Sequence, residues 1–172
     1  MYLNQEETVN NCKTKFLSAT TVEEIISISN SFKGLINNEL LKELEVGFRP
    51  YRYISCSEAE LEYLKNELAK IESDTNGSDK IEIEKQIKQI EQELKGTYIR
   101  EDETDIERYT RYIKALSLAL DDSWERHYFY WCYYDKWGGK SSEYVDMEEE
   151  KIKKLGKISK YYEKRLEELK NK

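Results

Sequence analysis

Apolar side chains recur along most of the chain at three- and four-residue spacing, which is the period of an α-helix rather than of a strand. The clearest stripes are Leu61, Leu64, Leu68 and Ile71, followed by Ile83, Ile87, Ile90 and Leu94. The 172 residues contain one proline and seven glycines, and so few helix breakers favour long helices. The pattern therefore predicts an all-α protein.

Three short helices are predicted near the N-terminus, over about 4–17, 22–32 and 37–46. The sequence Thr21-Val22-Glu23-Glu24 is a capping box, in which the Thr hydroxyl accepts from a backbone N–H three residues on. Several β-branched residues in the second segment make a strand the alternative: Val22, Ile25, Ile26 and Ile28. The capping box favours the helix, and Gly34 is expected to follow its end.

An extended connector is predicted over 48–56, Phe-Arg-Pro-Tyr-Arg-Tyr-Ile-Ser-Cys. Pro50 cannot continue a helix, and it biases Arg49 towards an extended conformation. We therefore expect a structural boundary at this point.

Residues 57–96 are predicted to form a short antiparallel helical hairpin. A second capping box, Ser57-Glu58-Ala59-Glu60, precedes the first apolar stripe, and Asn76-Gly77 marks a turn before the second. Each arm has about two heptads, as in a short coiled coil, and such short helices need neighbours to pack against.

A longer helical hairpin is predicted over the rest of the chain. Its first helix opens at the capping box Thr104-Asp105-Ile106-Glu107 and is expected to reach Trp137, before Gly138-Gly139. The expected inward stripe is Ile106, Tyr109, Ile113, Leu116, Leu120, Trp124, Tyr128 and Trp131. The last helix is expected over about 142–171, with Met147, Ile152, Leu155, Ile158, Tyr162, Leu166 and Leu169 inward and pairs Glu149–Lys153 and Glu150–Lys154. The short connection makes these two helices antiparallel neighbours.

The predicted fold is therefore an all-α helical bundle with long antiparallel helical hairpins and a short coiled-coil-like hairpin. We divide the chain into 1–56 (short helices and connector), 57–96 (acidic hairpin) and 97–172 (long hairpin with an aromatic cluster). These segments are expected to form one compact unit from which the 57–96 hairpin either projects or packs back.

The formal net charge is −7, which disfavours direct binding to nucleic acid because that affinity comes largely from phosphate neutralisation. Residues 57–96 carry a net −5, whereas 141–172 carry +1. The acidic segment could compete with nucleic acid for a basic partner, or it could be the solvated face of a coiled coil.

Three widely spaced cysteines indicate a reducing compartment rather than a disulfide framework: Cys12, Cys56 and Cys132. The first residues are polar and acidic, unlike a signal peptide, and no apolar run approaches membrane-spanning length. A cytoplasmic protein is expected.

The sequence offers little for catalysis. His127 is the only histidine, and Cys132 lies five positions away on a poorly matched helix face. No short-spaced pairs of ligands indicate a zinc site, and no phosphate-binding loop is present. The carboxylate clusters lie at helix starts or on polar faces, where they favour the helix dipole. We therefore expect a non-enzymatic protein without cofactor or metal.

The most unusual segment is 124–137, where eight of fourteen residues are aromatic. One helix face cannot hold them all, so some face a second layer of the bundle or an outside partner. If this helix is central, its neighbours cover the aromatics. Otherwise the candidates for binding a partner through aromatic area and hydroxyl groups are Tyr130, Tyr133, Tyr134 and Trp137.

A second candidate set interleaves basic and aromatic residues within the connector: Arg49, Tyr51, Arg52 and Tyr53. Such a mixture can stack on bases and contact phosphates. The alternative is that the two tyrosines pack on the core while the arginine head groups stay in water.

The composition, rich in Lys, Glu, Ile, Asn and Tyr, resembles that of small proteins from AT-rich bacterial and phage genomes. Such proteins include phage inhibitors of host defence complexes, anti-CRISPR proteins among them. The resemblance covers composition only, and it implies a binding protein that inhibits a protein partner, such as a host nucleic-acid enzyme. The alternatives are a self-associating structural or assembly protein and a small nucleic-acid-binding module.

Overall fold

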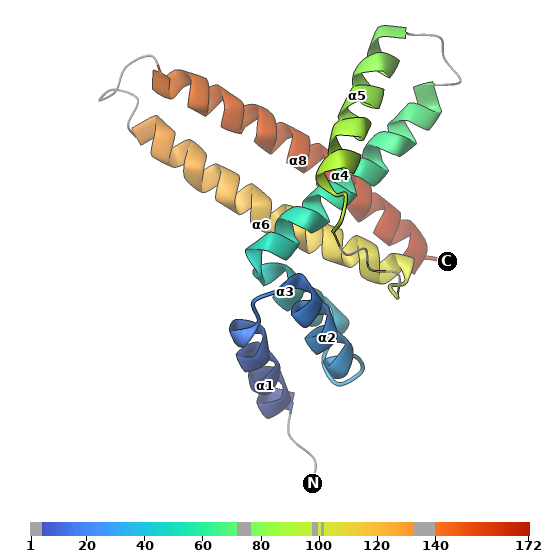
Figure 1. Ribbon diagram of the computed structural model, residues 1–172, viewed down its shortest axis with the longest axis vertical. Helices are drawn as coiled ribbons and strands as arrows, with labels where there is room; N and C mark the ends of the chain where they lie inside the picture. The colour runs from blue at the N-terminus through green and yellow to red at the C-terminus, as the bar shows by residue number, and fades with distance from the viewer. Residues whose placement is uncertain (1–4, 72–76, 98–99, 101, 133–139) are drawn as a thin grey trace.

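A computed structural model of the protein describes residues 5–71, 77–97, 100, 102–132 and 140–172, with side chains of the last range described from 143. It is an all-α helical bundle, as predicted (Figure 1). Its helices are α1 (Gln5–Ser18), α2 (Val22–Phe32), α3 (Asn38–Gly47), α4 (Arg49–Ile71), α5 (Gly77–Glu93), α6 (Asp105–Cys132) and α8 (Lys140–Lys170). Within these described ranges the one β-type contact is an isolated bridge between Lys33 and Ile36.

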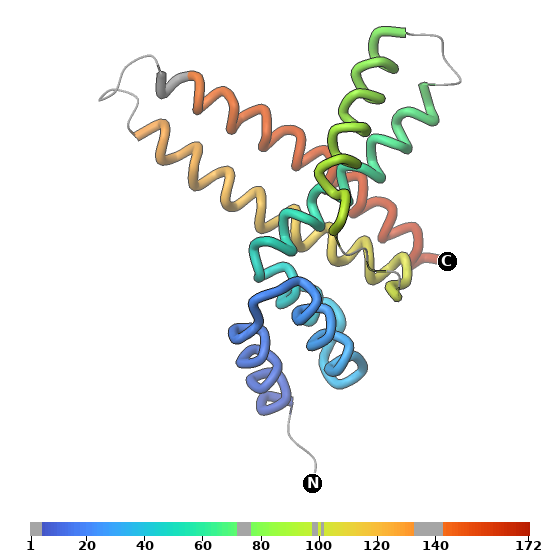
Figure 2. The backbone as a smooth tube through the Cα atoms, in the orientation of Figure 1, coloured from blue at the N-terminus to red at the C-terminus, as the bar shows by residue number. Residues whose placement is uncertain are grey.

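The long helices α6 and α8 lie side by side (Figure 2). Helix α4 packs against α6 and extends with α5 to one side, whereas α1, α2 and α3 lie on the other (Figure 1). One end of the α6–α8 pair reaches beyond all the other helices (Figure 1). That end contains the C-terminal part of α6 and the N-terminal part of α8.

Two hydrophobic clusters hold these helices together. The larger joins α4, α5, α6 and α8, and at its centre the ring of Tyr162 lies 5.4 Å from that of Tyr109 and 5.1 Å from that of Tyr112. The smaller joins α1, α2 and α3 with the first turn of α4, through Cys12, Phe16, Ile25, Ile26, Phe32, Ile36, Leu41 and Tyr51. Helix α4 therefore contributes to both.

Two of the three predicted capping boxes cap helices. The Thr21 hydroxyl accepts from the Glu24 backbone N–H at 3.2 Å, and Thr104 accepts likewise from Glu107 at 3.2 Å. Gly34, with φ of +85°, follows the end of α2 as predicted. The box at Ser57 is wrong as a helix start, because Ser57 lies inside α4.

The prediction of an extended connector over 48–56 is also wrong, because α4 begins at Arg49 and continues without a break to Ile71. Pro50 lies in the first turn, where its missing N–H has no helical acceptor and its fixed φ suits the helix. No boundary in the backbone separates 1–56 from 57–96 within this helix, and the division into three segments stays a prediction.

The expected inward stripe is wrong at the far end of the α6–α8 pair. Trp124, Tyr128 and Trp131 are more than half exposed, and so is Met147 of α8. Smaller or polar side chains are buried instead along this part of the pair: Ala119, Ser123, Val145 and Glu148. The reason is that two helices without a third layer bury only a narrow seam, which leaves the flanking face in water.

None of the helices in the described ranges has the length and apolarity needed to cross a bilayer.

Candidate partner-binding surface and buried ion network

Three large aromatic side chains lie on one exposed face of α6, at positions i, i+4 and i+7. Trp124, Tyr128 and Trp131, here called the aromatic face, have exposed fractions of 54%, 70% and 63%. Because a buried Trp or Tyr contributes about 150–250 Å², these fractions leave roughly 300–450 Å² exposed. A patch of that size equals the largest on typical monomers, and such patches often mark binding sites.

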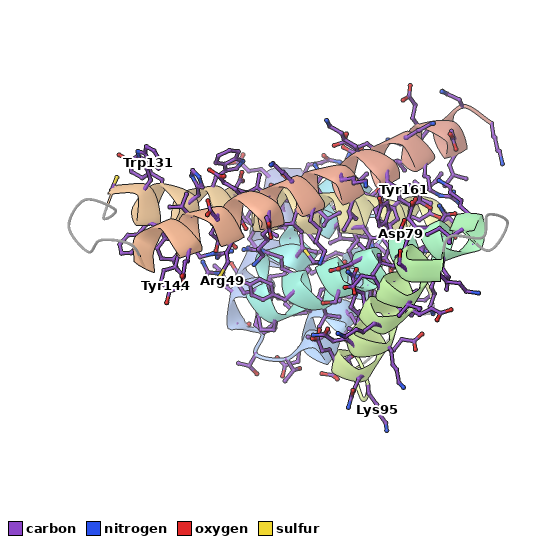
Figure 3. All side chains as sticks on the ribbon, turned by 90° about the horizontal axis from the view of Figure 1, so that it is seen from above. Arg49, Asp79, Lys95, Trp131, Tyr144 and Tyr161 are labelled. Carbon is purple, nitrogen blue, oxygen red and sulfur yellow. The ribbon has the colours of Figure 1, made fainter. Side chains whose placement is uncertain are left out.

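Further aromatics surround this face. Phe129 is 46% exposed, and Tyr144 of α8 is 48% exposed and stacks on Tyr130 with ring centroids 5.1 Å apart. Trp131 and Tyr144 lie at the same end of the molecule, on different sides of the helix pair (Figure 3). The aromatic surface therefore wraps around the end of the pair. Tyr130, a predicted binding residue, is only partly exposed because Tyr144 covers it.

The same end of the molecule is strongly acidic. Residues 121–150 contain nine Asp and Glu against three Lys and Arg, a net −6. The one arginine of α6 in this range, Arg126, donates to Glu148 at 2.9 Å, and His127 contacts Glu149 at 3.1 Å. Apart from Glu148, which is buried, and Asp122, which pairs with Arg52 of α4, the described carboxylates of this range are exposed. We call the whole region the acidic aromatic end.

Three of the predicted binding residues, Tyr133, Tyr134 and Trp137, lie outside the described residues.

The second predicted set does not form one surface. Tyr51 is 1% exposed, and the guanidinium of Arg111 lies 5.2 Å from the centre of its ring. Arg52 is 8% exposed and donates to Asp122 at 2.8 Å. Only Arg49 and Tyr53 are exposed, because they lie four residues apart on one face of α4, whereas Tyr51 and Arg52 lie on the face that packs against α3 and α6.

The structure also contains a buried ion network that the sequence did not predict. Its members are Lys42 and Glu45 of α3, Arg100 and Glu103 of the segment before α6, and Glu107 and Arg111 of α6. Lys42 donates to Glu103 at 2.9 Å, and Arg111 donates to the same carboxylate at 2.8 Å. Arg100 reaches Glu45 at 2.5 Å.

Hydroxyl and amide groups complete this network. Arg111 donates to the Ser55 hydroxyl at 2.7 Å, Arg100 donates to the Asn30 side chain at 2.9 Å, and Ser29 donates to Glu45. Helices α2, α3, α4 and α6 therefore all meet at these charges. The network ties the N-terminal helices to the long pair.

Burial and charge act in opposite directions on the carboxylates of the network. Burial alone raises the pKa of Glu103, but Arg111 and Lys42 outweigh it and lower that pKa to about 2. At Glu58, which contacts Arg111 at 3.0 Å, burial prevails and the pKa is raised. The Tyr51 hydroxyl and one oxygen of Glu45 are buried without a hydrogen-bond partner among the described residues.

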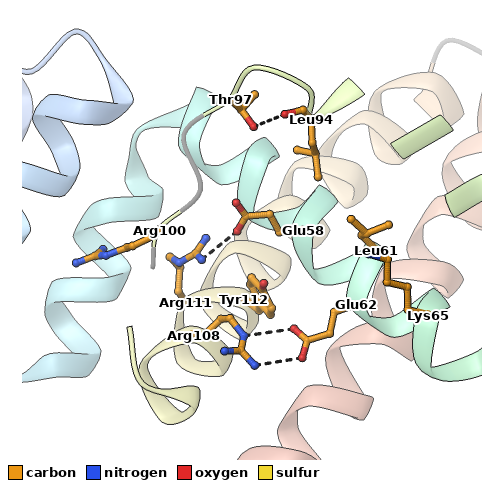
Figure 4. Close-up of a pocket in the computed structure, with 10 residues that line it drawn as sticks. All are labelled: Glu58, Leu61, Glu62, Lys65, Leu94, Thr97, Arg100, Arg108, Arg111 and Tyr112. Carbon is orange, nitrogen blue, oxygen red and sulfur yellow. Dashed lines mark hydrogen bonds and ion pairs between the residues drawn. The ribbon is translucent and has the colours of Figure 1, made fainter. Parts of the chain in front are cut away.

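A cavity of about 300 Å³ opens beside the network, between α4, α6 and the end of α5 (Figure 4). Arg111 pairs with Glu58 on its wall, and Arg108 pairs with Glu62 through two hydrogen bonds of 3.3 and 3.2 Å (Figure 4). These charged side chains pair with one another. The cavity wall therefore does not indicate a binding site for a charged ligand.

Two of the three cysteines, Cys12 and Cys56, are not activated as nucleophiles. Burial raises the pKa of Cys12 to about 11 and that of Cys56 to about 12, so both thiols stay protonated at neutral pH. His127 contacts Glu149 and the ring of Trp124. No group of His, Cys, Asp and Glu residues within the described ranges has the geometry to hold a metal ion.

Comparison with known proteins found no matching family model, no matching curated protein and no matching solved structure.

Proposed function

We propose that this chain is a non-enzymatic binding protein whose acidic aromatic end docks on a basic surface of a protein partner and inhibits it. The observation that carries the proposal is the exposure of Trp124, Tyr128 and Trp131 within a region of net charge −6. Aromatic side chains dominate the energetic centres of protein interfaces, and they combine large area with few rotatable bonds.

The charge favours a partner that normally holds nucleic acid. Carboxylates around an aromatic centre are complementary to a groove lined by Lys and Arg, and they speed its association. The indole and phenol faces can also accept arginine side chains through cation–π contacts. A host nucleic-acid enzyme or defence complex, blocked in the manner of an anti-CRISPR protein, fits both requirements.

A second candidate is self-association of the chain as a structural or assembly protein. The same aromatic face favours it, since two copies could bury these side chains against each other. Light scattering over a range of concentrations separates the two candidates. A strict monomer argues against self-association, whereas a dimer lost in the Trp124→Ala/Tyr128→Ala variant supports it.

The main proposal is tested by capture from nuclease-treated lysate of a low-GC bacterium. The wild-type protein is compared with Trp124→Ala/Tyr128→Ala and with a control, Leu17→Ala/Leu35→Ala, which removes two exposed apolar side chains far from this end. We expect one basic protein to be retained by wild type and control, lost by the aromatic variant, and released by salt.

The captured protein is then purified, and its binding to nucleic acid is measured with and without this chain. Inhibition by wild type but not by the aromatic variant supports the proposal. Equal capture by all three forms, or capture without any effect on nucleic-acid binding, would contradict it. Circular dichroism verifies that each variant is folded.

A further inference from the structure

Helix α8 changes sign of charge along its length. Residues 143–150 contain five acidic residues and no basic one, whereas 151–172 contain nine Lys and Arg against three Glu, a net +6. Four of these lysines, here called the lysine row, follow 4-3-4 spacing on one face: Lys153, Lys157, Lys160 and Lys164. All four are exposed.

The lysine row has no carboxylate partner within 4.0 Å among the described residues. The predicted pair of Glu149 with Lys153 does not form, because Glu149 contacts His127 instead. The predicted pair of Glu150 with Lys154 also does not form, because Lys154 contacts Glu60 of α4. These contacts leave the four ammonium groups of the row facing water.

We propose that the lysine row binds the phosphate backbone of a nucleic acid. The four side chains span eleven residues of helix, about 16 Å, and over that length each strand of a duplex presents about five phosphates. Glu150, the last residue of the acidic aromatic end, lies about 4.5 Å along the helix from Lys153. It lies about 15 and 21 Å from Lys160 and Lys164, beyond the Debye length of about 8 Å at physiological salt, so its repulsion is screened over the second half of the row. The net charge of the whole chain therefore does not decide what this face binds.

The composition of this face argues against a protein as its occupant. No large apolar side chain is exposed on α8 between 151 and 172, and a protein interface needs an apolar centre and usually contains few lysines. The acidic aromatic end of a second copy would find nothing there on which to bury its rings. Lysine ammonium groups alone suit phosphates, which are contacted as point charges.

The test is fluorescence anisotropy with a labelled 20-base-pair duplex of mixed sequence and a labelled 30-nucleotide RNA, from 50 to 200 mM salt. For the duplex we expect log K to fall with log salt with a slope of about −3 to −4, since four phosphates are contacted. The variant Lys157→Gln/Lys160→Gln should weaken binding at 50 mM salt at least about ten-fold and reduce the slope by roughly two.

A matched control, Lys85→Gln/Lys88→Gln, removes the same charge from exposed positions of α5. It should change binding less than three-fold. Equal weakening by both variants, or no binding of either nucleic acid at 50 mM salt, would overturn the proposal. So would self-association at low salt that only the α8 variant abolishes, because the row would then contact protein. None of these results bears on the acidic aromatic end, which the α8 variant leaves intact.

Discussion

Arg111 shows how single residues hold this fold together. Its guanidinium is almost fully buried, and its partners come from different segments: Glu103 before α6, and Ser55 and Glu58 on α4. The rings of Tyr51 and Tyr112 lie 5.2 and 5.1 Å away, within cation–π range. A buried charge of this kind is stable only when the groups around it compensate for the loss of water, as these carboxylate, hydroxyl and aromatic groups do.

Replacing Glu103 by Gln should strongly destabilise the protein. The change keeps the shape of the side chain, but it leaves Lys42 and Arg111 buried without the carboxylate they share, at a cost of about 3–5 kcal/mol. Urea denaturation measures the loss. Glu91→Gln is the control, because the Lys65–Glu91 pair is half exposed at both ends and should cost under about 1 kcal/mol. Equal effects of the two substitutions would contradict this role for the network.

The contribution of Glu103 should disappear in acid. Its pKa of about 2 in the folded protein lies below the ordinary 4.5, so its stabilisation is complete above pH 4.5 and is lost as the pH falls towards 2. This lowering of the pKa corresponds to a contribution of about 3 kcal/mol to the free energy of unfolding at neutral pH. Glu58 acts in the opposite direction, because a raised pKa makes the folded state bind a proton more readily.

The measurement is the difference in unfolding free energy between wild type and Glu103→Gln from pH 6 to pH 2. We expect this difference to shrink steadily below pH 4.5, since protonated Glu103 resembles Gln. A difference that stays constant over this range would show that Glu103 is not held as a carboxylate by its neighbours.

At the scale of elements, α6 has two parts with different surroundings. Near its start it is enclosed by α3, α4 and α8, and Tyr109, Thr110, Arg111 and Tyr112 are all buried. Towards its end the smaller residues Ala119 and Ser123 are buried, and the large aromatics face water. One continuous helix thus serves as core at one end and as exposed surface at the other.

Alanine substitutions should separate these two parts. Leu116→Ala, at a fully buried position, should cost about 2–5 kcal/mol because it leaves a cavity. Trp124→Ala/Tyr128→Ala should cost less than about 1 kcal/mol, since both side chains are more than half exposed. Thermal unfolding followed by circular dichroism compares them. A large loss of stability in the double variant would show that the aromatic face belongs to a core, and it would remove the basis of the proposed function.

At the scale of the molecule, the α6–α8 pair contains two neighbouring regions whose net charges are equal in magnitude and opposite in sign. Residues 121–150 carry a net −6 and 151–172 a net +6. The net charge of 141–172 is only +1. It did not reveal this separation of charge, because that range includes both the acidic and the basic part of α8. A molecule arranged in this way can present an acidic surface to one partner and a basic surface to another.

Tryptophan fluorescence offers a direct measure of the acidic region, because all three tryptophans lie within 124–137. The quenching constants for caesium and iodide are each divided by the constant for a free tryptophan amide. The caesium ratio should be the larger, since the local carboxylates attract cations. The difference should fall near 1 M salt, where the Debye length is about 3 Å. Asp121→Asn/Glu125→Gln should reduce it, and preferential quenching by iodide would contradict the charge distribution.

The sequence by itself determined that the fold is all-α and where α2 and α6 begin, although it did not predict the start of α4. The caps at Thr21 and Thr104 were predicted correctly because they depend on residues only three positions apart. It also indicated that the aromatic cluster exceeds what one core face can hold. It could not select the exposed residues, and it favoured Tyr130, which Tyr144 covers, over Tyr128.

Tertiary structure alone decided the rest. In the sequence, Lys42, Glu45 and Arg111 have the pattern of solvated helix faces, and Glu103 that of an acidic residue before a helix start. They form a buried network only because α3, α4 and α6 pack together. Helix α4 likewise starts at Arg49 with Tyr51 and Arg52 buried, because α3 and α6 provide groups for both side chains to contact. Local spacing sets the period of each helix, whereas burial depends on neighbours that are distant in the chain and absent from any local pattern.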